Sequence, residues 1–572
     1  MSAPSRSVRS AIASVLILTA CAASAIALVA SAPAALRARS HDALVTAALD
    51  QLAASVYDHA DRPGAAVIVV KDGVPVLRKG YGVANLELGV PITPDMVFEI
   101  GSVTKQFTAA AILMLVQENK VALDVNFRKY TDKYVTVPMH EEAVSIEALL
   151  THTSGIPNYT DMSAWQERSR SDVTLQGLID VFGGAAFDFP PGTNWRYSNS
   201  GYVLLGAVVE AVSGMRYADF LEQRIFQPLH MAHTAYGDQS RVTAERASGY
   251  DVVNGHYVNA GFLSMTQSFS AGAILSTVDD LAAWNAGLDG HALLSDASKA
   301  RMWTAFTLPD GRDTGYGYGW RVGSRDGKSV QEHGGLINGY IGHVVRLPDD
   351  HVYVAVLTND YSRGAEPGQL AEALAVTAAG RPRVDPPAVS GLSLSGDLAG
   401  AYQGPFDQRY TVVFDNGRYG VLRNQQAVPL VPMGADAFFI AGEFNRFTFE
   451  RDAARKPVRL RVRGFANETI AARTAAVPIA RAAITLPEAT LDRYVGVYQM
   501  APSGSMTVRR DAGRLFERID KQPEFEIFAE AENRFFLKTV DVQLTFQSDS
   551  SGRVTGLILH QSGRDYQGVR QR

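Results

Sequence analysis

The chain has 572 residues, of which 46% are hydrophobic and 20% are charged, which excludes a disordered or collagen-like protein. Its 54 Lys and Arg residues against 59 Asp and Glu residues give a net charge of −5, and the absence of a basic block argues against nucleic-acid binding. The single cysteine, Cys21, excludes an intrachain disulfide and a cysteine-rich zinc site.

The N-terminal segment, residues 1–36, predicts an export signal. Arg6 and Arg9 precede an uncharged run rich in Ala, Val, Ile and Leu, which small residues interrupt near Pro33. Two alternatives stay open: lipidation at Cys21, whose surroundings resemble a bacterial lipoprotein box, and an uncleaved membrane anchor, since about 20 apolar residues span a bilayer. We expect a periplasmic or secreted protein that contacts a membrane only through this segment.

Mixed strand and helix patterns in residues 41–379 predict one α+β domain. Buried hairpins are expected at 65–79 and 341–358, and helical periodicity runs over 103–119 and 201–212. Strands at both ends of the segment, with helices between them, predict one sheet closed by the two ends of the domain.

An internal repeat follows a proline-rich linker at 380–390. The sequence at 400–403 (GAYQ) returns at 496–499 (GVYQ), and three further matches follow in the same order at nearly the same spacing. Both copies alternate short strand patterns with turn residues, which predicts two small antiparallel β-barrels at 391–475 and 486–572.

The first candidate catalytic motif is Ser102-Val103-Thr104-Lys105. Positions i and i+3 share one face of a helix, so the Lys105 amine can lie beside the Ser102 hydroxyl. A serine becomes an effective nucleophile when a neighbour takes its proton, and an amine can do so once burial lowers its pKa. Taken alone, the motif is more typical of a serine cap followed by a solvated lysine.

Two further motifs follow in the same segment. Tyr197 and Asn199 are separated by one residue ahead of a predicted helix, so both side chains can face one cleft; a second Tyr-x-Asn at Tyr257 shows that this pattern is weak alone. His333 and Gly335 belong to a His-Gly-Gly motif before the second hairpin, where glycines allow close approach of a ligand. A lone histidine is more often structural than catalytic.

Together and in this order, the motifs resemble the penicillin-recognising serine hydrolases: class C β-lactamases, DD-peptidases and related esterases and aminopeptidases. Similar segments are FEIGSVTKQFTAAA (98–111), LLTHTSGIP (149–157), YSNSGYVLLG (197–206), YGYGW (316–320) and HGGLINGY (333–340). The resemblance implies a β-lactamase/transpeptidase-like domain, in which an antiparallel sheet has helices on both sides and a helical subdomain, ahead of the two barrels.

The resemblance also implies roles for individual residues. Ser102 is the acylated nucleophile and Lys105 is the general base that activates it. Tyr197 relays a proton to the leaving group and helps to activate the deacylating water. No metal and no cofactor are implied.

Substrate contacts follow from the same resemblance. Asn199 holds the substrate amide, while His333 and Gly335 line the cleft near the substrate's carboxylate or the Tyr197 hydroxyl. The backbone N–H groups of Ser102 and Leu336 form the oxyanion hole.

One departure from the β-lactamase pattern concerns the third motif. Class C β-lactamases have Lys-Thr-Gly where this chain has His-Gly-Gly, and histidine is only partly protonated near neutral pH. His-x-Gly is typical of the family's DD-peptidases and D-aminopeptidases. The resemblance therefore implies poor hydrolysis of β-lactams, while slow acylation by them stays open.

A hydrolase domain followed by two barrels also resembles the three-part D-aminopeptidases, in which a loop of the last barrel selects a free substrate amine. The second copy of the repeat contains Glu524, Glu526, Glu530 and Glu532, whereas the matching stretch of the first contains only Asp436. An acidic loop would suit an ammonium group; a solvated acidic turn explains the cluster equally well.

The sequence thus predicts an exported serine hydrolase that forms an acyl-enzyme on Ser102 and acts on small or D-amino-acid-containing peptides. A carboxylesterase or a weak β-lactamase is the alternative within the family. A catalytically silent protein that binds peptidoglycan peptides is the alternative of another class, and three intact motifs count against it. The expected partners are a small peptide, ester or β-lactam-like substrate and no nucleic acid, and a homodimer is left open.

Overall fold

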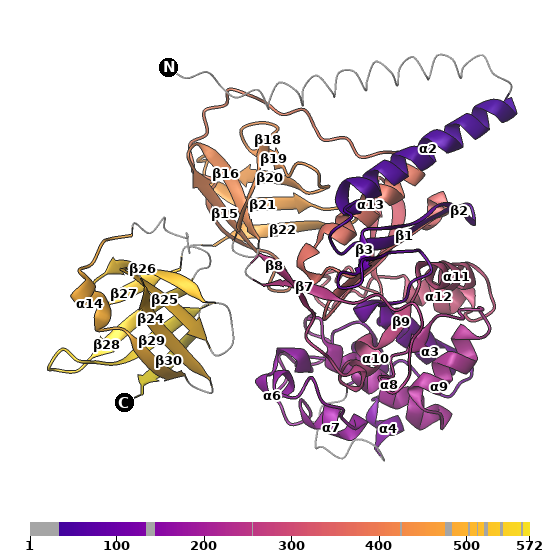
Figure 1. The fold of residues 1–572 in the computed structure, drawn as a ribbon, viewed down its shortest axis with the longest axis horizontal. Coiled ribbons are helices and arrows are strands. Elements are labelled where there is room, and N and C mark those ends of the chain that lie inside the picture. Colours follow the sequence, from indigo (N-terminus) through magenta and orange to yellow (C-terminus); the bar gives the residue numbers. More distant parts are fainter. Residues whose placement is uncertain are drawn as a thin grey trace. The chain divides into compact units, whose positions relative to one another are not determined.

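The computed structural model describes residues 34–132, 144–253, 255–423, 426–474, 483–500, 504–511, 513–519, 524–537, 542–561 and 564–571. The chain divides into two compact units, Met1–Val384 with Phe465–Asn467, and Asp385–Gly464 with Glu468–Arg572 (Figure 1). Most of the predicted signal segment lies outside the described residues, and helix α2 (Ala34–Tyr57) begins at its end. Among the helices described, none is both long and apolar enough to cross a membrane.

A six-stranded antiparallel sheet forms the centre of the first unit, in the order β10-β11-β12-β13-β1-β2. Its strands are β10 (Arg321–Arg325), β11 (Lys328–Ile337), β12 (Tyr340–Leu347), β13 (Val352–Thr358), β1 (Ala65–Lys71) and β2 (Val74–Tyr81). The first strand pairs with the last, with Val67 opposite Val356, and this confirms the prediction of a sheet closed by the two ends of the domain. Both predicted hairpins, β1–β2 and β12–β13, are confirmed as well.

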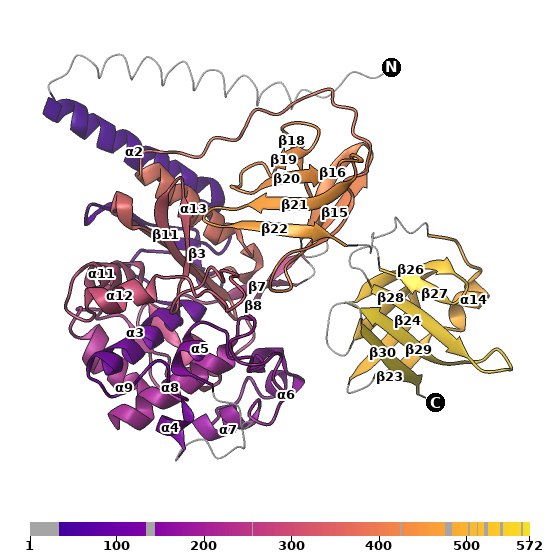
Figure 2. The same ribbon diagram turned by 180° about the vertical axis from the view of Figure 1, so that it is seen from behind.

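Helices cover both faces of this sheet. Every residue of β13, and every residue of β1 up to Val70, is buried, which requires cover on both sides because successive side chains point to opposite faces. Helix α13 (Glu366–Ala378) packs on β12 and β13, and α2 packs on α13 (Figure 2). Helix α11 (Val278–Asp289) packs on β13 and β1.

The helical part of this unit is built around α3 (Thr104–Gln117). Its residues from Thr104 to Leu115 are all buried, as expected for a helix that is enclosed on every side. Helix α3 packs against α8 (Asn199–Ser213) and α10 (Met265–Gly272), and α3 and α8 confirm the two predicted helices. The shorter helices are α4 (Arg128–Thr131), α5 (Ile146–Leu150), α6 (Ser163–Gln166), α7 (Leu175–Asp180), α9 (Tyr217–Leu221) and α12 (Asp296–Met302).

Three small sheets complete the first unit. They are β5 (Phe98–Glu99), β9 (Ile274–Ser276) and β6 (Ala235–Tyr236); β3 (Val83–Asn85) and β4 (Val90–Pro91); and β7 (Tyr250–Val253) and β8 (His256–Asn259).

The first copy of the repeat is a nearly closed antiparallel sheet in the order β17-β16-β15-β14-β22-β21-β20-β19-β18. The strands are β14 (Gly400–Gln403), β15 (Arg409–Asp415), β16 (Arg418–Arg423), β17 (Gln426–Pro429), β18 (Val431–Pro432), β19 (Ala437–Phe439), β20 (Arg446–Arg451), β21 (Pro457–Arg463) and β22 (Glu468–Arg473). Only Leu430 separates β17 from β18, so the two edges of the sheet meet at that residue.

The second copy is a closed barrel of eight strands, preceded by α14 (Glu488–Asp492). The strands are β23 (Gly496–Met500), β24 (Ser505–Asp511), β25 (Arg514–Ile519), β26 (Phe525–Ala531), β27 (Arg534–Phe536), β28 (Val542–Ser548), β29 (Val554–Gln561) and β30 (Arg564–Arg570). Both copies are therefore barrel-like, as predicted, while the exact domain boundaries stay predictions.

Equivalent contacts confirm that the two barrels are copies. Tyr402 lies opposite Arg473 and donates a hydrogen bond to the Leu398 carbonyl at 2.8 Å. Tyr498 lies opposite Arg570 and donates to the carbonyl four residues before it at 2.7 Å. The repeated sequence thus encodes the same strand closure in both copies.

At one inward position the second barrel has an acid, Glu517, where the first barrel has a valine. Glu517 is 5% exposed and shares its face of β25 with the core residue Leu515, so it points into the barrel. Its Oε2 is buried and has no hydrogen-bond partner among the residues that the structure describes. Glu517 lies opposite Val508, and at the matching register of the first copy Val421 lies opposite Val412.

This acid should make the stability of the second barrel depend on pH. Burial raises the pKa of the Glu517 carboxyl to about 7, and the charge of Glu524 adds to the rise. The folded state therefore favours the neutral acid. The stabilisation of the barrel by the neutral carboxyl is complete below about pH 4.5, the ordinary pKa of a glutamic acid, and is lost as the pH rises through about 7. The loss amounts to about 3 kcal/mol of the free energy of unfolding.

Hydrogen exchange measured by mass spectrometry tests this, because peptides from β24 and β25 report on this barrel alone. We expect faster exchange in these peptides at pH 7.5 than at pH 5, after correction for intrinsic rates. Glu517→Val, which copies the residue of the first barrel, should remove the difference. Equal pH dependence in wild type and Glu517→Val would contradict the prediction.

Candidate active site

Ser102 lies in a tight turn, η1 (Gly101–Val103), between β5 and α3. Gly101 adopts a positive φ of 50°, and a Cβ on it would lie 2.9 Å from the Leu336 nitrogen. A Cβ on Gly335 would lie 2.0 Å from the Ile100 carbonyl oxygen. These two glycines therefore allow β11 to run directly against the turn that carries the predicted nucleophile.

The Lys105 side chain is fully buried and points to Ser102. Its Nζ lies 3.0 Å from Ser102 Oγ, 2.7 Å from Asn199 Oδ1 and 2.8 Å from the Ala271 carbonyl oxygen. It also lies 4.8 Å from the centre of the Tyr197 ring. Burial holds the pKa of Lys105 well below its usual range, because the charged form has lost its hydration.

These contacts fix the direction of the Lys105 lone pair. A neutral amine has two N–H groups, and the amide oxygen of Asn199 and the carbonyl of Ala271 are both acceptors. When those two oxygens take the two protons, the lone pair faces Ser102 Oγ. The arrangement can therefore remove the proton of the serine hydroxyl.

Tyr197 comes from the loop ahead of α8 and reaches the same place. Its hydroxyl is buried close to the Ser102 hydroxyl and has no hydrogen bond of normal geometry among the described residues. Burial raises the pKa of Tyr197, while the nearby Ser102 hydroxyl and the charge of Arg321 oppose that rise. The hydroxyl thus keeps its proton at neutral pH and has hydrogen-bonding capacity left for a substrate.

Asn199 begins helix α8 and is held by the loop that precedes η2 (Tyr159–Asp161). Its backbone N–H donates to Asn158 Oδ1 at 3.0 Å, and its Nδ2 donates to Thr160 Oγ1 at 3.3 Å. The side chain was predicted to hold the substrate amide. In the structure its oxygen binds Lys105, so its observed contact is with the base.

His333 lies on β11 and is 3% exposed. Its Nδ1 is 2.6 Å from the Gly334 carbonyl, which can only accept, so the proton of the neutral ring is on Nδ1. Its Nε2 then accepts from the Tyr316 hydroxyl at 2.8 Å. Burial lowers the pKa of His333, as do the charges of Lys105 and Arg321, so the imidazole is neutral near pH 7.

Two aromatic neighbours were not singled out from the sequence. Tyr316, which holds His333, lies in the YGYGW segment. His152, from the LLTHTSGIP segment, packs 4.3 Å from the Tyr197 ring and accepts the Ser198 N–H at 3.1 Å. The resemblance of these segments was the available signal, because neither residue has a distinctive spacing of its own. The contact of Ala271 with Lys105 could not be predicted from the sequence, because it is made by the backbone carbonyl and not by the side chain.

The backbone groups predicted to form the oxyanion hole lie on adjoining segments. A Cβ on Gly335 would be 2.9 Å from the Ser102 nitrogen, and the Leu336 nitrogen lies equally close to the Cβ position of Gly101. Leu336 is 57% exposed, whereas Ser102 is half-buried. The structure thus brings together all seven predicted site residues, and their catalytic roles stay predictions. The described residues contain no group of three or more His, Cys, Asp or Glu side chains placed to hold a metal ion.

The four acids of the second barrel have arginine partners. The pairs are Glu524 with Arg509, Glu526 with Arg514 at 3.3 Å, Glu530 with Arg534 at 3.6 Å, and Glu532 with Arg493 at 2.8 Å. Two of these acids belong to β26 itself. This pairing favours a solvated acidic surface over an acidic loop that awaits an ammonium group.

A family model described as Beta-lactamase matches residues 45–379, more than half of the chain. The chain belongs to the β-lactamase family. The family consists of serine hydrolases, and its fold is the one described above for the first unit. A second family model, a domain of unknown function (DUF3471), matches residues 480–570.

Named relatives are similar to part of the chain. The D-aminopeptidase of Gluconobacter oxydans (strain 621H) is 29% identical over 308 residues, which is 52% of this chain and 56% of that protein. Penicillin-binding protein 4* of Bacillus subtilis (strain 168) is 28% identical over 309 residues, which is 51% of this chain and 67% of that protein. The chain thus spans little more than half the length of the first relative.

A solved structure is similar over a longer stretch. The octameric penicillin-binding protein homologue from Pyrococcus abyssi has a TM-score of 0.53 and 25% sequence identity, and the match covers 75% of this chain and 99% of that chain.

The buried amine predicts an unusual pH dependence of Ser102 labelling. Because the pKa of Lys105 is held well below 10.5, the rate of reaction with a neutral fluorophosphonate should rise with pH and level off well below pH 10.5. Lys105→Ala should lower this rate by about 100-fold or more. Labelling for fixed times between pH 5 and 10, with the adduct measured by intact mass, gives the labelling rate as a function of pH. A labelling rate that still rises at pH 10 without levelling off would contradict a neutral base.

Proposed function

We propose that the chain is an exported hydrolase that forms an acyl-enzyme on Ser102 and cleaves amide bonds of small or D-amino-acid-containing peptides. The observation that carries the mechanism is the buried Lys105 amine, 3.0 Å from Ser102 Oγ and with its two N–H groups taken by acceptors. Membership of the β-lactamase family and similarity to a protein named D-aminopeptidase support the reaction class.

In the proposed acylation step, Ser102 Oγ attacks the substrate carbonyl carbon and its proton passes to Lys105 Nζ. The carbonyl oxygen becomes an oxyanion that the N–H groups of Ser102 and Leu336 would stabilise; one such donor is typically worth about 3 kcal/mol. The proton then returns through the Tyr197 hydroxyl to the leaving amine as the C–N bond breaks. Water attacks the ester in the second half of the reaction and regenerates Ser102.

The neutral state of His333 favours a peptidase over a β-lactamase. A charged lysine at this place would attract the carboxylate of a β-lactam, whereas His333 has one nitrogen bound to Gly334 and the other to Tyr316. An uncharged position leaves penicillin without that ion pair. We therefore propose that β-lactams acylate Ser102 slowly and are released slowly.

Intact mass after incubation with a fluorophosphonate and, separately, with benzylpenicillin tests the nucleophile. We expect a fluorophosphonate adduct on wild type and none on Ser102→Ala, because only an activated serine reacts. We also expect a penicilloyl adduct that persists. If well-folded wild type forms neither adduct, the catalytically silent peptide-binding protein becomes the better interpretation. Rapid release of hydrolysed penicillin would instead indicate a β-lactamase.

Hydrolysis of D-alanine and L-alanine p-nitroanilides, compared with p-nitrophenyl acetate, tests the substrate class. We expect kcat/KM to be at least tenfold higher for the D-anilide than for the L-anilide, with all activity lost in Ser102→Ala. Tyr197→Phe should reduce anilide hydrolysis more than acetate hydrolysis, since an amine needs a proton to leave. Turnover of the acetate alone would favour the carboxylesterase.

Export and self-association are parts of the same proposal. The basic, apolar and small-residue order of residues 1–36 supports export to the periplasm or the medium, and the mass of the N-terminal peptide from the source cell distinguishes cleavage from lipidation at Cys21.

The Pyrococcus abyssi homologue is octameric, which supports assembly of this chain into a homo-oligomer. Light scattering of the purified protein gives the number of subunits.

A further inference from the structure

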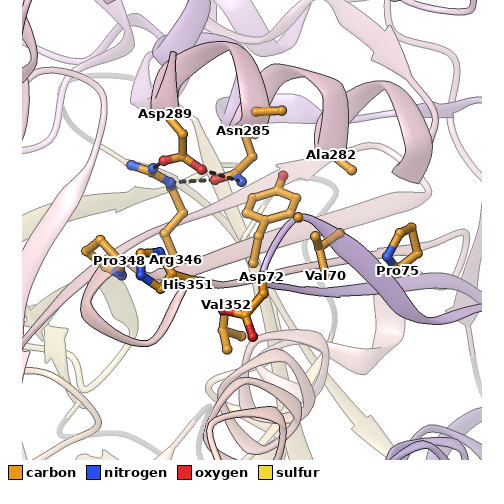
Figure 3. A pocket seen from close by; sticks show the side chains of 13 residues that line it. Val70, Asp72, Pro75, Ala282, Asn285, Asp289, Arg346, Pro348, His351 and Val352 are labelled. Carbon is orange, nitrogen blue, oxygen red and sulfur yellow. Dashed lines mark hydrogen bonds and ion pairs between the residues drawn. The ribbon is translucent and has the colours of Figure 1, made fainter. Parts of the chain in front are cut away.

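A cavity of about 540 Å³ lies between helix α11 and the central sheet, away from Ser102 (Figure 3). Ile341 of β12 pairs with Leu336 at the nucleophile, and Arg346 of the cavity is five residues further along the same strand. Five residues of extended strand span about 17 Å. The cavity therefore does not belong to the catalytic site.

The sheet contributes one row of side chains that crosses four strands. Arg346 lies opposite Gln331 on one side and Tyr353 on the other, and Tyr353 lies opposite Val70. Residues that are directly opposite one another share a face of the sheet, so this row points toward α11. Helix α11 presents Ala282, Asn285, Ala286 and Asp289 to the cavity, a spacing of three and four that forms one helix face.

Small side chains leave this space open. Where α11 faces the row, two of its four lining residues are alanines, Ala282 and Ala286, whose side chains are a single methyl group. The other walls are Val70, Gly73, Pro75, Pro348 and Val352, which are apolar, and the polar residues Asp72 and His351. The side chain of Asp72 is 62% exposed and pairs with Lys71 at 3.2 Å, so its charge is met outside the cavity. A largely apolar cavity of a few hundred Å³ with a few convergent polar groups is typical of a small-molecule site.

Arg346 supplies a buried positive charge. It is 3% exposed, and its guanidinium lies 4.4 Å from the centre of the Trp303 ring. Its Nε donates to Asn285 Oδ1 at 2.6 Å and its Nη2 donates to Asp289 (Figure 3). Its Nη1 donates to Gln331 Oε1 at 2.5 Å. A guanidinium has five N–H donors, so two remain without an acceptor among the described residues.

Tyr353 supplies a second unused donor. Tyr353 is 1% exposed and lines the cavity, and its hydroxyl has no hydrogen-bond partner in the part of the chain that the structure describes. A buried hydroxyl without a partner is rare, because it has lost the hydrogen bonds that water would give it. Since Tyr353 lies opposite Arg346, both unused donors act on the same part of the cavity.

We propose that this cavity binds a small monocarboxylate with an apolar chain. The carboxylate accepts from the free N–H groups of Arg346 and from the Tyr353 hydroxyl, and the chain packs on the apolar walls and Ala282. Asp289, the carboxylate that already pairs with Arg346, has a side chain 61% exposed, so it stands at the rim and does not fill the interior. An amine offers no acceptor to these donors.

Isothermal titration calorimetry of the full chain with 4-methylpentanoate tests the proposal. The control ligand is 3-methylbutylamine, a cation with a similar branched alkyl chain. We expect saturable binding of the carboxylate at millimolar concentration or tighter, roughly as for a ligand of this size, and no binding of the amine. No saturable binding of 4-methylpentanoate, or equal binding of the amine, would overturn the proposed ligand class.

Three variants locate the binding site. Tyr353→Phe removes one hydrogen-bond donor and should raise the Kd about tenfold, while Ala282→Leu fills the cavity and should abolish binding. Ala300→Leu adds the same side chain at an exposed position of α12 and should leave the Kd unchanged. Binding that survives Tyr353→Phe and Ala282→Leu would place the carboxylate elsewhere and refute the site. Unchanged fluorophosphonate labelling of Ser102 shows that each variant is folded.

Discussion

The burial of one amine is the constraint on which the rest of the first unit depends. A lysine that has lost its hydration is stable only where acceptors take its N–H groups, and here Asn199 Oδ1 and the Ala271 carbonyl do so. Those acceptors come from α8 and α10, and the lysine comes from α3. The three helices that pack together in the helical core are thus also the three that orient the base toward Ser102.

Close approach of the backbone is the second constraint, and it links the helical region to the sheet. The turn that carries Ser102 touches β11 through Gly101 and Gly335, where no Cβ would fit. Strand β11 lies more than 200 residues later in the chain and reaches the turn because β13 pairs with β1 and closes the sheet. The two segments that carry the Ser102 and Leu336 backbone N–H groups therefore meet only in the completed domain.

The two barrels show how one repeated sequence can keep its fold and change its interior. Both copies retain the tyrosine and arginine that face each other where the first and last strands pair. At one inward position the first copy has Val421 and the second has Glu517. A closed barrel tolerates this exchange below about pH 7, where the carboxyl is neutral because burial raises its pKa.

The sequence by itself determined the fold class, both hairpins, the two main helices, the repeat and the family to which the chain belongs. These depend on local periodicity and on motifs whose spacing is short, such as Ser102 with Lys105 and Tyr197 with Asn199. Only the tertiary structure decided how the polar groups pair. The Ala271 carbonyl on Lys105, the Tyr316 hydroxyl on His333 and the Asn285 amide oxygen on Arg346 make contacts between residues distant in the chain, and neither composition nor spacing records which partner each will meet.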